Sequence, residues 1–504
     1  MVFAVAVVIV LLFVCWGVIS PDRLASTSAA ILNLTTEKFG WFYLLATFGF
    51  LIFSVFLAFS KFGMVKLGAD DDRPEYSNRS WFAMLFSAGM GIGLVFWGAA
   101  EPLSHYINPP QDASPQTAEA ARLAMRYSFF HWGLHAWAIY TVIGLAIAYF
   151  TFRKGRSGLI SSVFYPLIGD RVNGPLGKAI DILAIIATIF GVATSLGLGT
   201  LQINGGLHQL LHLPNNFSVQ LTIILVVTVL YLLSATTGLD KGIKILSNAN
   251  LGIAALLLVF VLFAGPTAFI FDVFTTTIGS YLQNLVQMSL TLTPFSQGNW
   301  IKNWTLFYWA WWIAWAPFVG MFIARVSKGR TIKEFVLGVL LVPSVFGFLW
   351  FAVFGGTALN LELFHNGKIA EAAQTDVTSA LFNTLQQLPI GGILTIIATL
   401  LIITFFITSA DSATFVLGML SSKGIPNPKT KVKLVWGILQ SSIAAVLLLS
   451  GGLQGLQTAS IIAALPFSII MVLMCYSLYS SLQEDLDKAG PHVKNTEKEN
   501  PSQN

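Results

Sequence analysis

The chain has 504 residues, of which 55% are hydrophobic and only 10% are charged, and its formal net charge is +5. A soluble domain carries about 25% charged residues. This composition, with a mean hydropathy of +0.74, excludes a soluble globular protein and predicts an all-α protein that crosses a membrane many times. The two cysteines lie in apolar runs, so neither a disulfide framework nor a metal site is expected.

Apolar runs long enough to span a bilayer have roughly 17–25 residues. The sequence contains twelve, near 2–19, 41–60, 81–100, 127–151, 179–200, 217–234, 249–270, 304–324, 334–356, 391–420, 434–450 and 456–479. One alternate set of loops holds 19 Lys and Arg and the opposite set holds six. Because basic loops stay in the cytoplasm, both termini are predicted to be cytoplasmic. This sorting explains the positive charge without a nucleic-acid partner. The polar segment 483–504 is expected to be a disordered tail.

The third apolar run contains Ser87 followed by the sequence Gly-Met-Gly-Ile-Gly at 89–93. Each glycine weakens a helix by about 1 kcal/mol relative to alanine. Two interpretations are open: small residues that let helices pack closely, or a broken helix whose free backbone groups bind a cation or an anionic ligand group. The candidate ligand-site residues here are Gly89, Met90, Gly91 and Gly93. Glu101 is expected to end this run at the outer surface.

The fourth run carries an aromatic cluster. Trp132, Trp137 and Tyr140 fall within an arc of about 140° on a helical wheel. His131 and His135 have the i, i+4 spacing of metal ligands, but no third ligand is evident. Packed or solvated histidines are therefore the preferred interpretation, and the aromatic residues are candidates for one wall of a binding site.

The eighth run is the most unusual stretch, because four of the fourteen tryptophans lie within seven residues of it. Tyr308, Trp311, Trp312 and Trp315 share one helical face. Tryptophan commonly anchors a helix at the membrane interface, but Trp312 and Trp315 lie deeper. A face of indoles inside a membrane is either simple packing or a cage for a cation without hydrogen-bond donors, such as a quaternary ammonium group.

Pro317 and Gly320 are expected to interrupt the helix of the eighth run. Interrupted runs therefore recur at the third and eighth positions, the spacing that an inverted repeat of five spans would give, with a binding site near the membrane midplane. The run ends in a basic segment with Arg325 and Arg330. These residues are either a cytoplasmic anchor or part of a gate.

The tenth run contains Thr408, Ser409 and Asp411, the last being the only acid expected deep in an apolar run. Acids inside a membrane are costly and usually functional. The two hydroxyls are hard oxygen ligands suited to sodium. Asp411 is expected to have a structural or gating role. The sequence shows no metal triad, nucleophile–base pair or nucleotide loop, so neither enzymatic activity nor a cofactor is expected.

With these motifs in order, the chain resembles the betaine–choline–carnitine transporter (BCCT) family along essentially its whole length. The resemblance rests on segments 89–93, 130–140, 309–318 and 408–412. It implies a LeuT-like fold with two inverted five-helix repeats, about 81–270 and 303–480, and a homotrimer in the bacterial cell membrane. It also implies sodium-coupled import of glycine betaine or a related quaternary-ammonium solute for osmoprotection.

The resemblance also implies roles for individual residues. Trp132, Trp137, Tyr140 and Trp312 would form a box around the trimethylammonium group, and Trp311 and Trp315 would line the pathway below it. One sodium ion would be held by backbone carbonyls of Ser87, Met90 and Phe405 and by the hydroxyls of Thr408 and Ser409. A second sodium site would include Thr188 and Phe318. Val192 stands where some relatives have a hydroxyl.

The intact glycine motif bears on the substrate. Choline transporters of this family carry an Asp at the position of Gly93, and sodium-independent carnitine exchangers lack the motif. This sequence resembles neither. The alternatives that stay open are a sodium-independent exchanger and an uptake system for choline, carnitine, proline betaine or ectoine.

Overall fold

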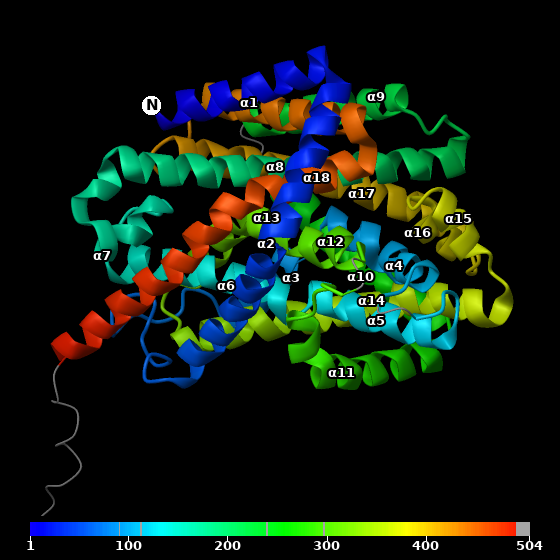
Figure 1. Cartoon of the computed structure of the whole chain (residues 1–504), viewed down its shortest axis with the longest axis horizontal. Coiled ribbons are helices and arrows are strands. Elements are labelled where there is room, and N and C mark those ends of the chain that lie inside the picture. Colours follow the sequence, from blue (N-terminus) through cyan, green and yellow to red (C-terminus); the bar gives the residue numbers. More distant parts are fainter. Residues whose placement is uncertain (90, 111–112, 238–239, 296–297, 490–504) are drawn as a thin grey trace, which may run out of the picture.

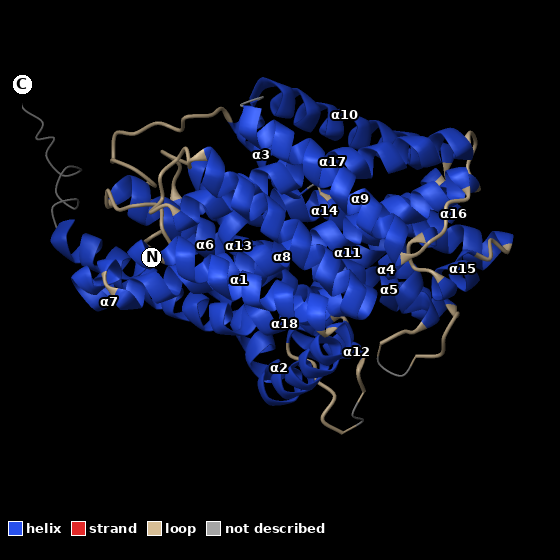
Figure 2. Ribbon diagram, turned by 90° about the horizontal axis from the view of Figure 1, so that it is seen from above, coloured by secondary structure: helices blue, strands red, loops and turns tan. Residues whose placement is uncertain are grey.

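The computed structural model describes residues 1–504 except 90, 111–112, 238–239, 296–297 and 490–504. Within these described residues the chain is helical and has no strand (Figure 2). The helices are α1 (Val2–Ile19), α2 (Pro21–Phe59), α3 (Asn78–Gly89), α4 (Ile92–Ile107), α5 (Ala118–Trp132), α6 (Leu134–Ala148), η1 (Tyr149–Arg153), η2 (Ser161–Phe164), α7 (Tyr165–Ile168), η3 (Gly169–Asn173), α8 (Pro175–Leu211), α9 (Phe217–Thr237), α10 (Asp240–Ala264), α11 (Thr267–Ser289), α12 (Trp300–Asn303), α13 (Thr305–Arg325), α14 (Ile332–His365), α15 (Ile369–Thr375), α16 (Ser379–Gln386), α17 (Gly391–Ser421) and α18 (Thr430–Ala489).

Ten helical stretches of the described chain are long and apolar enough to cross a membrane. This number counts α18 once, although α18 has a non-helical residue at Gly452 (φ 53°) that separates two predicted runs. It omits the third predicted run, which is divided between α3 and α4. The structure thus confirms an all-helical, multi-pass architecture, and the count of twelve spans stays a prediction. α18 continues to Ala489, into the predicted tail.

The loops with many basic residues meet at one end of the molecule. The Leu67 amide donates to the Arg330 carbonyl at 2.8 Å, and Arg153 pairs with Asp70 at 2.7 Å. Helix α18 reaches the same region, where Lys154 pairs with Asp485. The sorting of charge along the sequence is therefore also a sorting in space.

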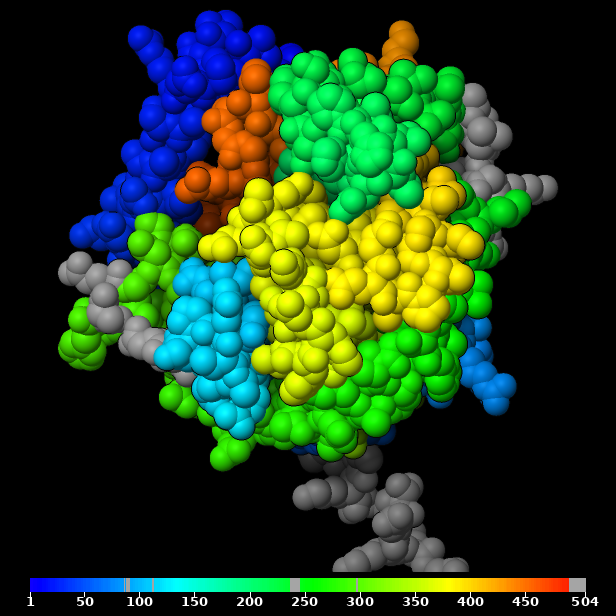
Figure 3. Space-filling model, turned by 90° about the vertical axis from the view of Figure 1, so that its right-hand side faces the viewer, coloured from blue at the N-terminus to red at the C-terminus, as the bar shows by residue number. Residues whose placement is uncertain are grey.

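The loops of the opposite set lie at the other end. There the Trp300 indole donates to the Asn108 carbonyl at 3.0 Å, and the Asn215 amide donates to Asp376 at 2.7 Å. Figure 3 shows this end, where α15 and α16 (yellow) lie beside the cyan residues of the α4–α5 region.

Helix α13 lies in the middle of the bundle (Figure 1) and packs on α6, α8 and α18. The expected interruption of this helix at Pro317 and Gly320 is wrong, because α13 is continuous from Thr305 to Arg325. Neighbouring helices allow a proline to remain inside a membrane helix. Gly320 instead permits close packing: a Cβ atom there would lie 2.5 Å from Ile143 Cγ2 on α6.

Two helix breaks shape the region in front of α13. Helix α3 ends at Gly89, and Gly91 is extended (φ −170°, ψ −177°) before α4 begins. The prediction of an interrupted third run is confirmed. The fourth run, read as one helix, is also broken, at Gly133 between α5 and α6. A side chain at Gly133 would meet the Phe129 carbonyl at 2.6 Å and Phe348 at 2.8 Å, so close approach requires glycine there.

Candidate substrate-binding site

The predicted aromatic residues come together where α5, α6 and α13 meet. We call Trp132, Trp137, Tyr140, Trp311 and Trp312 the aromatic cluster. Its rings make edge-to-face contacts: Trp137 with Tyr140 (centroids 5.4 Å apart, 76°), Tyr140 with Trp312 (5.9 Å, 84°) and Trp312 with Trp132 (4.8 Å, 82°). Trp311 stacks on Trp312 at 5.1 Å and 18°. Ring faces carry the negative side of the aromatic quadrupole, and rings set at steep angles to one another can turn a face toward a shared ligand.

The indoles of the cluster are fixed by hydrogen bonds at their edges. Trp312 Nε1 donates to the His131 carbonyl at 2.9 Å, and Trp132 Nε1 donates to Glu101 Oε2 at 2.8 Å. Trp311 differs, because its Nε1 is buried and has no partner in the described part of the chain. An unsatisfied buried donor costs about 1–3 kcal/mol, so this N–H is available to a polar group of a ligand.

One face of α13 becomes more accessible along its length. Tyr308 is 0% exposed and Trp312 is 9% exposed, Trp315 and Phe318 are half-buried, and Phe322 is 39% exposed. Trp315 is held by its Nε1, which donates to the Gly191 carbonyl at 2.8 Å and to Ser195 Oγ at 3.0 Å on α8. Exposure among these residues therefore rises from the aromatic cluster toward the end with the basic loops.

The glycine segment packs against the cluster. A Cβ atom at Gly93 would lie 2.4 Å from Trp311 Cη2 and 3.3 Å from Trp132 Cη2. A Cβ atom at Gly91 would meet no heavy atom within 4 Å. Gly93 therefore makes room for the aromatic rings, whereas Gly91 borders open space. Met90 lies outside the described residues, and of Gly89 the structure gives only its place at the end of α3.

The sequence did not identify Glu101 as a site residue. The expectation that Asp411 is the only acid buried in an apolar run is wrong, because Glu101 is 0% exposed and lies inside α4, which continues to Ile107. The Glu101 carboxylate accepts hydrogen bonds from His105, His131, Trp132 and Tyr308. The expectation of satisfied histidines is confirmed for His131, which also lies 3.0 Å from Thr305 Oγ1.

Glu101, His105 and His131 bring three metal-ligating atoms within 4.8 Å of one another. His131 Nδ1 lies only 2.7 Å from Glu101 Oε1. Two ligands about 2.0–2.1 Å from one tetrahedral ion would lie farther apart. The arrangement is that of a hydrogen-bond network around a carboxylate.

Of the predicted sodium ligands, Thr408 (8% exposed) and Phe405 (5% exposed) are buried and adjacent on α17, and Ser409 is half-buried beside them. The Thr408 hydroxyl donates to the Thr404 and Phe405 carbonyls. It also accepts from Asn250 Nδ2 of α10 at 3.3 Å. Ser87 is half-buried on α3, which packs on α13 and α14. The joint ligand set from α3 and α17 stays a prediction.

Asn250 is a further residue that sequence reasoning missed. It is 1% exposed, and its Oδ1 has no partner in the described residues. A single amide at the start of the seventh apolar run was the available signal. An unpaired carbonyl oxygen beside Thr408 is a hard ligand suited to a small cation.

The residues of the second predicted sodium site lie on α8 and α13, which pack together. Thr188 is 0% exposed and its hydroxyl donates to the Ala184 carbonyl at 2.7 Å. Phe318 contacts Trp315 edge to face at 5.0 Å. Val192 is buried on the same helix as Thr188. This second site stays a prediction.

The predicted gate residues have different environments. Arg325 forms an exposed ion pair with Glu75 at 3.0 Å. Arg330 is 2% exposed, lies 3.9 Å from the centre of the Trp81 ring and donates to Asn78 and the Tyr76 carbonyl. Both contacts join the C-terminal side of α13 to the segment that opens α3. Asp411 is buried on α17 at 9% exposure.

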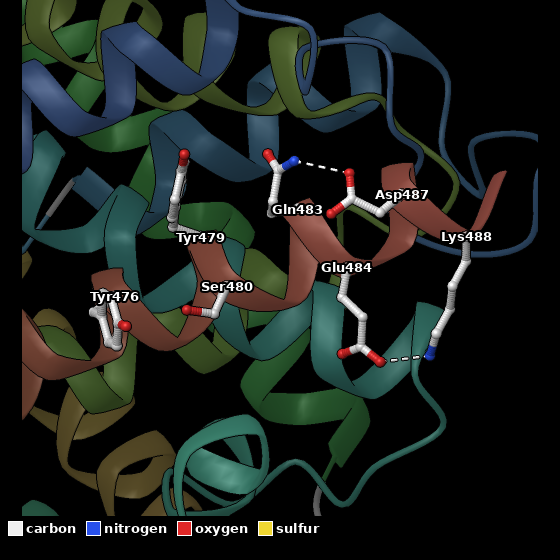
Figure 4. Close-up of a pocket in the computed structure, with 7 residues that line it drawn as sticks. All are labelled: Tyr476, Tyr479, Ser480, Gln483, Glu484, Asp487 and Lys488. Atoms are coloured by element: carbon white, nitrogen blue, oxygen red, sulfur yellow. Dashed lines mark hydrogen bonds and ion pairs between the residues drawn. The ribbon is translucent and has the colours of Figure 1, made fainter. Parts of the chain in front are cut away.

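A hollow on the surface of α18 lies apart from these sites. Figure 4 shows its lining, in which Gln483 pairs with Asp487 at 2.9 Å and Glu484 pairs with Lys488 at 2.5 Å. All seven lining residues come from this one helix: Tyr476, Tyr479, Ser480, Gln483, Glu484, Asp487 and Lys488. Among the described residues, no second element contributes a group to this exposed helix face.

Comparison with known proteins identifies the family of the chain. The profile of the betaine/carnitine/choline family transporters (BCCT) matches residues 1–487. The chain is 56% identical over 486 residues to the glycine betaine transporter OpuD of Bacillus subtilis (strain 168), covering 96% of this chain and 94% of the relative. It is 50% identical over 489 residues to the ectoine/hydroxyectoine transporter of Virgibacillus pantothenticus, covering 97% of each chain.

A probable glycine betaine transporter of Desulfitobacterium hafniense (strain Y51) is 50% identical over 480 residues, with 95% of this chain and 96% of the relative covered. The relatives are transporters, in agreement with the expectation that the chain is not an enzyme. The family match covers almost the whole chain, including the motifs that form the aromatic cluster. The protein is therefore a membrane transporter of the BCCT family.

Proposed function

We propose that the protein is a sodium-coupled symporter that imports glycine betaine, or a related quaternary-ammonium solute, for osmoprotection. The observation that carries this proposal is the aromatic cluster, in which rings from α5, α6 and α13 meet in the middle of a membrane bundle. A trimethylammonium group cannot donate hydrogen bonds, so ring faces are its natural partners. Each desolvated cation–π contact is worth about 2 kcal/mol or more.

The same site offers a partner for the carboxylate of a betaine. Trp311 Nε1 is a buried donor without a partner in the described residues, and the extended backbone at Gly91 borders open space. Backbone N–H groups at a helix start bind anionic groups. The aromatic cluster would hold the cationic end, and the Gly91 segment with Trp311 would hold the anionic end.

Sodium coupling is supported by the oxygen atoms around Thr408. Thr408, the Phe405 carbonyl and the unpaired Oδ1 of Asn250 lie on α17 and α10. Ser87, Met90 and Ser409 would complete this site, and Thr188 with Phe318 would contribute to a second one. An ion bound there would favour one conformation by its differential affinity for the two states.

The proposed architecture has twelve spans with two inverted repeats, about 81–270 and 303–480, and both termini in the cytoplasm. The gathering of basic loops at one end supports this orientation. Arg325 and Arg330 would then hold the cytoplasmic side of α13, and Asp411 would have a structural or gating role. A homotrimer is proposed by resemblance to the family.

Two alternatives have specific support. The relative from Virgibacillus pantothenticus is named an ectoine/hydroxyectoine transporter, so this chain is also a candidate for ectoine uptake. Ectoine lacks a trimethylammonium group and offers hydrogen-bond donors. A sodium-independent exchanger is the alternative for the mechanism, and choline, carnitine and proline betaine are further candidate substrates.

The test is uptake of labelled glycine betaine into proteoliposomes with and without an inward sodium gradient. Concentrative uptake that needs the gradient supports the proposal. Trp312→Ala should abolish it, whereas the matched control Trp41→Ala, which removes an indole that is 52% exposed on α2, should not. Uptake that only equilibrates and ignores sodium contradicts symport, and stronger competition by ectoine than by glycine betaine contradicts the substrate.

A further inference from the structure

Glu101 is a fully buried carboxylate whose two oxygen atoms accept hydrogen bonds from four side chains. Its Oε1 accepts from His131 Nδ1 at 2.7 Å and His105 Nε2 at 3.2 Å. Its Oε2 accepts from Tyr308 OH at 2.5 Å and Trp132 Nε1 at 2.8 Å. The donors come from α4, α5 and α13, so one side chain ties together three helices that surround the aromatic cluster.

The hydrogen-bond geometry allows all four partners of Glu101 to donate to its carboxylate. His131 donates through Nδ1 to Glu101, and its Nε2 lies 3.0 Å from Thr305 Oγ1, whose hydroxyl can donate to it. A neutral His131 satisfies both contacts, and His105 needs only its Nε2 proton. These tautomers are inferred from the network. We take the state in which all four partners donate, and in that state Glu101 is a carboxylate that carries one buried negative charge.

This charge lies next to the aromatic cluster through two of its donors. Trp132 belongs to the cluster and contacts Trp312 at 4.8 Å, and Tyr308 stacks on Trp312 at 6.2 Å and 23°. A charge-assisted hydrogen bond is stronger than a neutral one. An indole that donates to a carboxylate gains electron density in its ring, which makes the ring face more negative and strengthens its attraction for a cation.

We propose that Glu101 is a positioning residue that sets the charge specificity of the site. It orients the Trp132 indole. Through this indole and its own charge, it makes the aromatic cluster bind a permanent cation more tightly than a neutral group of the same shape. The inference rests on the proposed function and deepens it. The carboxylate acts through Trp132 and through its own charge, which water screens little in the membrane core. Neither effect attracts a neutral group in place of the cation, and the carboxylate that both ligands share experiences the same field.

The test compares glycine betaine with 3,3-dimethylbutanoate, in which carbon replaces the cationic nitrogen and the carboxylate is kept. Binding to the purified full-length chain in lipid nanodiscs is measured by tryptophan fluorescence, and the analogue is titrated directly and in competition. For the wild type we expect glycine betaine to bind at least tenfold more tightly. Glu101→Gln should weaken glycine betaine at least tenfold and change the analogue less than threefold, so the selectivity collapses.

Two variants separate charge from structure. Glu101→Asp keeps the charge and should keep at least part of the selectivity. A merely structural role predicts instead that Glu101→Gln and Glu101→Asp each lower the affinity for both ligands equally. Glu119→Gln removes the same charge from an exposed ion pair with Arg122 and should change neither ligand. An unchanged selectivity ratio in Glu101→Gln overturns the inference. Wild-type protein that binds no glycine betaine contradicts the proposed function instead.

A second pair of variants covers the case in which Glu101→Gln does not fold. Trp132→Phe keeps a ring in the cluster but removes the N–H that donates to Glu101, whereas Trp137→Phe changes an indole that is not among the four donors. The selectivity ratio should fall at least threefold further in Trp132→Phe than in Trp137→Phe. Equal ratios in these two variants overturn the inference.

Discussion

Gly93→Ala is predicted to weaken substrate binding about 30-fold. The new Cβ would lie 2.4 Å from Trp311 Cη2, closer than non-bonded carbons approach. Trp311 cannot easily yield, because it is stacked between Phe307 (5.6 Å, 12°) and Trp312 (5.1 Å, 18°). Overpacking of this kind costs about 1–3 kcal/mol, and the upper end applies here. Replacing glycine by alanine in a helix also stabilises the helix by up to about 1 kcal/mol, which offsets part of this cost.

The net cost of about 2 kcal/mol corresponds to about 30-fold in a binding constant. The cost should appear in ligand affinity, because Trp311 belongs to the aromatic cluster and any shift that makes room for the new Cβ displaces it at the expense of its stacking. The assay is a tryptophan-fluorescence titration with glycine betaine. Gly49→Ala on α2 is the matched control, because a Cβ there meets no heavy atom within 4 Å. A Gly93→Ala protein that binds within threefold of the wild type would refute the reasoning.

Three further predictions follow from buried contacts. Asn250→Ala should raise the sodium concentration for half-maximal uptake at least fivefold at saturating substrate, because it removes the unpaired Oδ1 beside Thr408. An unchanged sodium dependence would exclude Asn250 as a sodium ligand. Arg330→Met should lower the melting temperature in detergent much more than Arg325→Met. The buried Arg330 guanidinium, with two hydrogen bonds and the Trp81 ring beside it, contributes on the order of 3 kcal/mol, whereas the exposed Arg325 ion pair contributes about 0–1 kcal/mol. Equal shifts of the melting temperature would contradict this. Gly320→Val should reduce the yield of folded protein, because even a Cβ lies 2.5 Å from Ile143 on α6; normal yield and transport would show that α6 and α13 separate readily.

The sequence predicted those parts of the site that depend on local pattern. The helical period placed Trp311, Trp312 and Trp315 on one side of α13, and the structure keeps them there. Three glycines in five residues indicated the break between α3 and α4. The prediction for Pro317 was wrong for a physical reason. The effect of a proline on a helix depends on the helices that pack around it, and these come from distant parts of the sequence.

Glu101 could not be found in this way. An acid followed by proline resembles the end of a membrane span, and the partners that bury Glu101 lie 30, 31 and 207 positions away, at His131, Trp132 and Tyr308. The available signal was weak. His105 follows at i+4, and Leu103, Tyr106 and Ile107 place further apolar surface beyond Pro102. Asn250 was missed for a similar reason, because the role of an isolated amide in an apolar run cannot be predicted until its neighbour in space is known.

The residues that the sequence missed have a common location, which bears on mechanism. Glu101 bonds to Tyr308, and Asn250 bonds to Thr408. Each pair joins a helix of the first predicted repeat to a helix of the second, as Thr194 with Ser460 and Trp315 with Gly191 also do. Polar contacts are costly to break inside a membrane. If transport requires one repeat to move against the other, bonds of this kind must rearrange or be carried along. Each of them therefore contributes to the relative stability of the two states. A ligand that binds beside one of them, as we propose for the cation beside Trp132 and for sodium beside Thr408, can shift that balance directly.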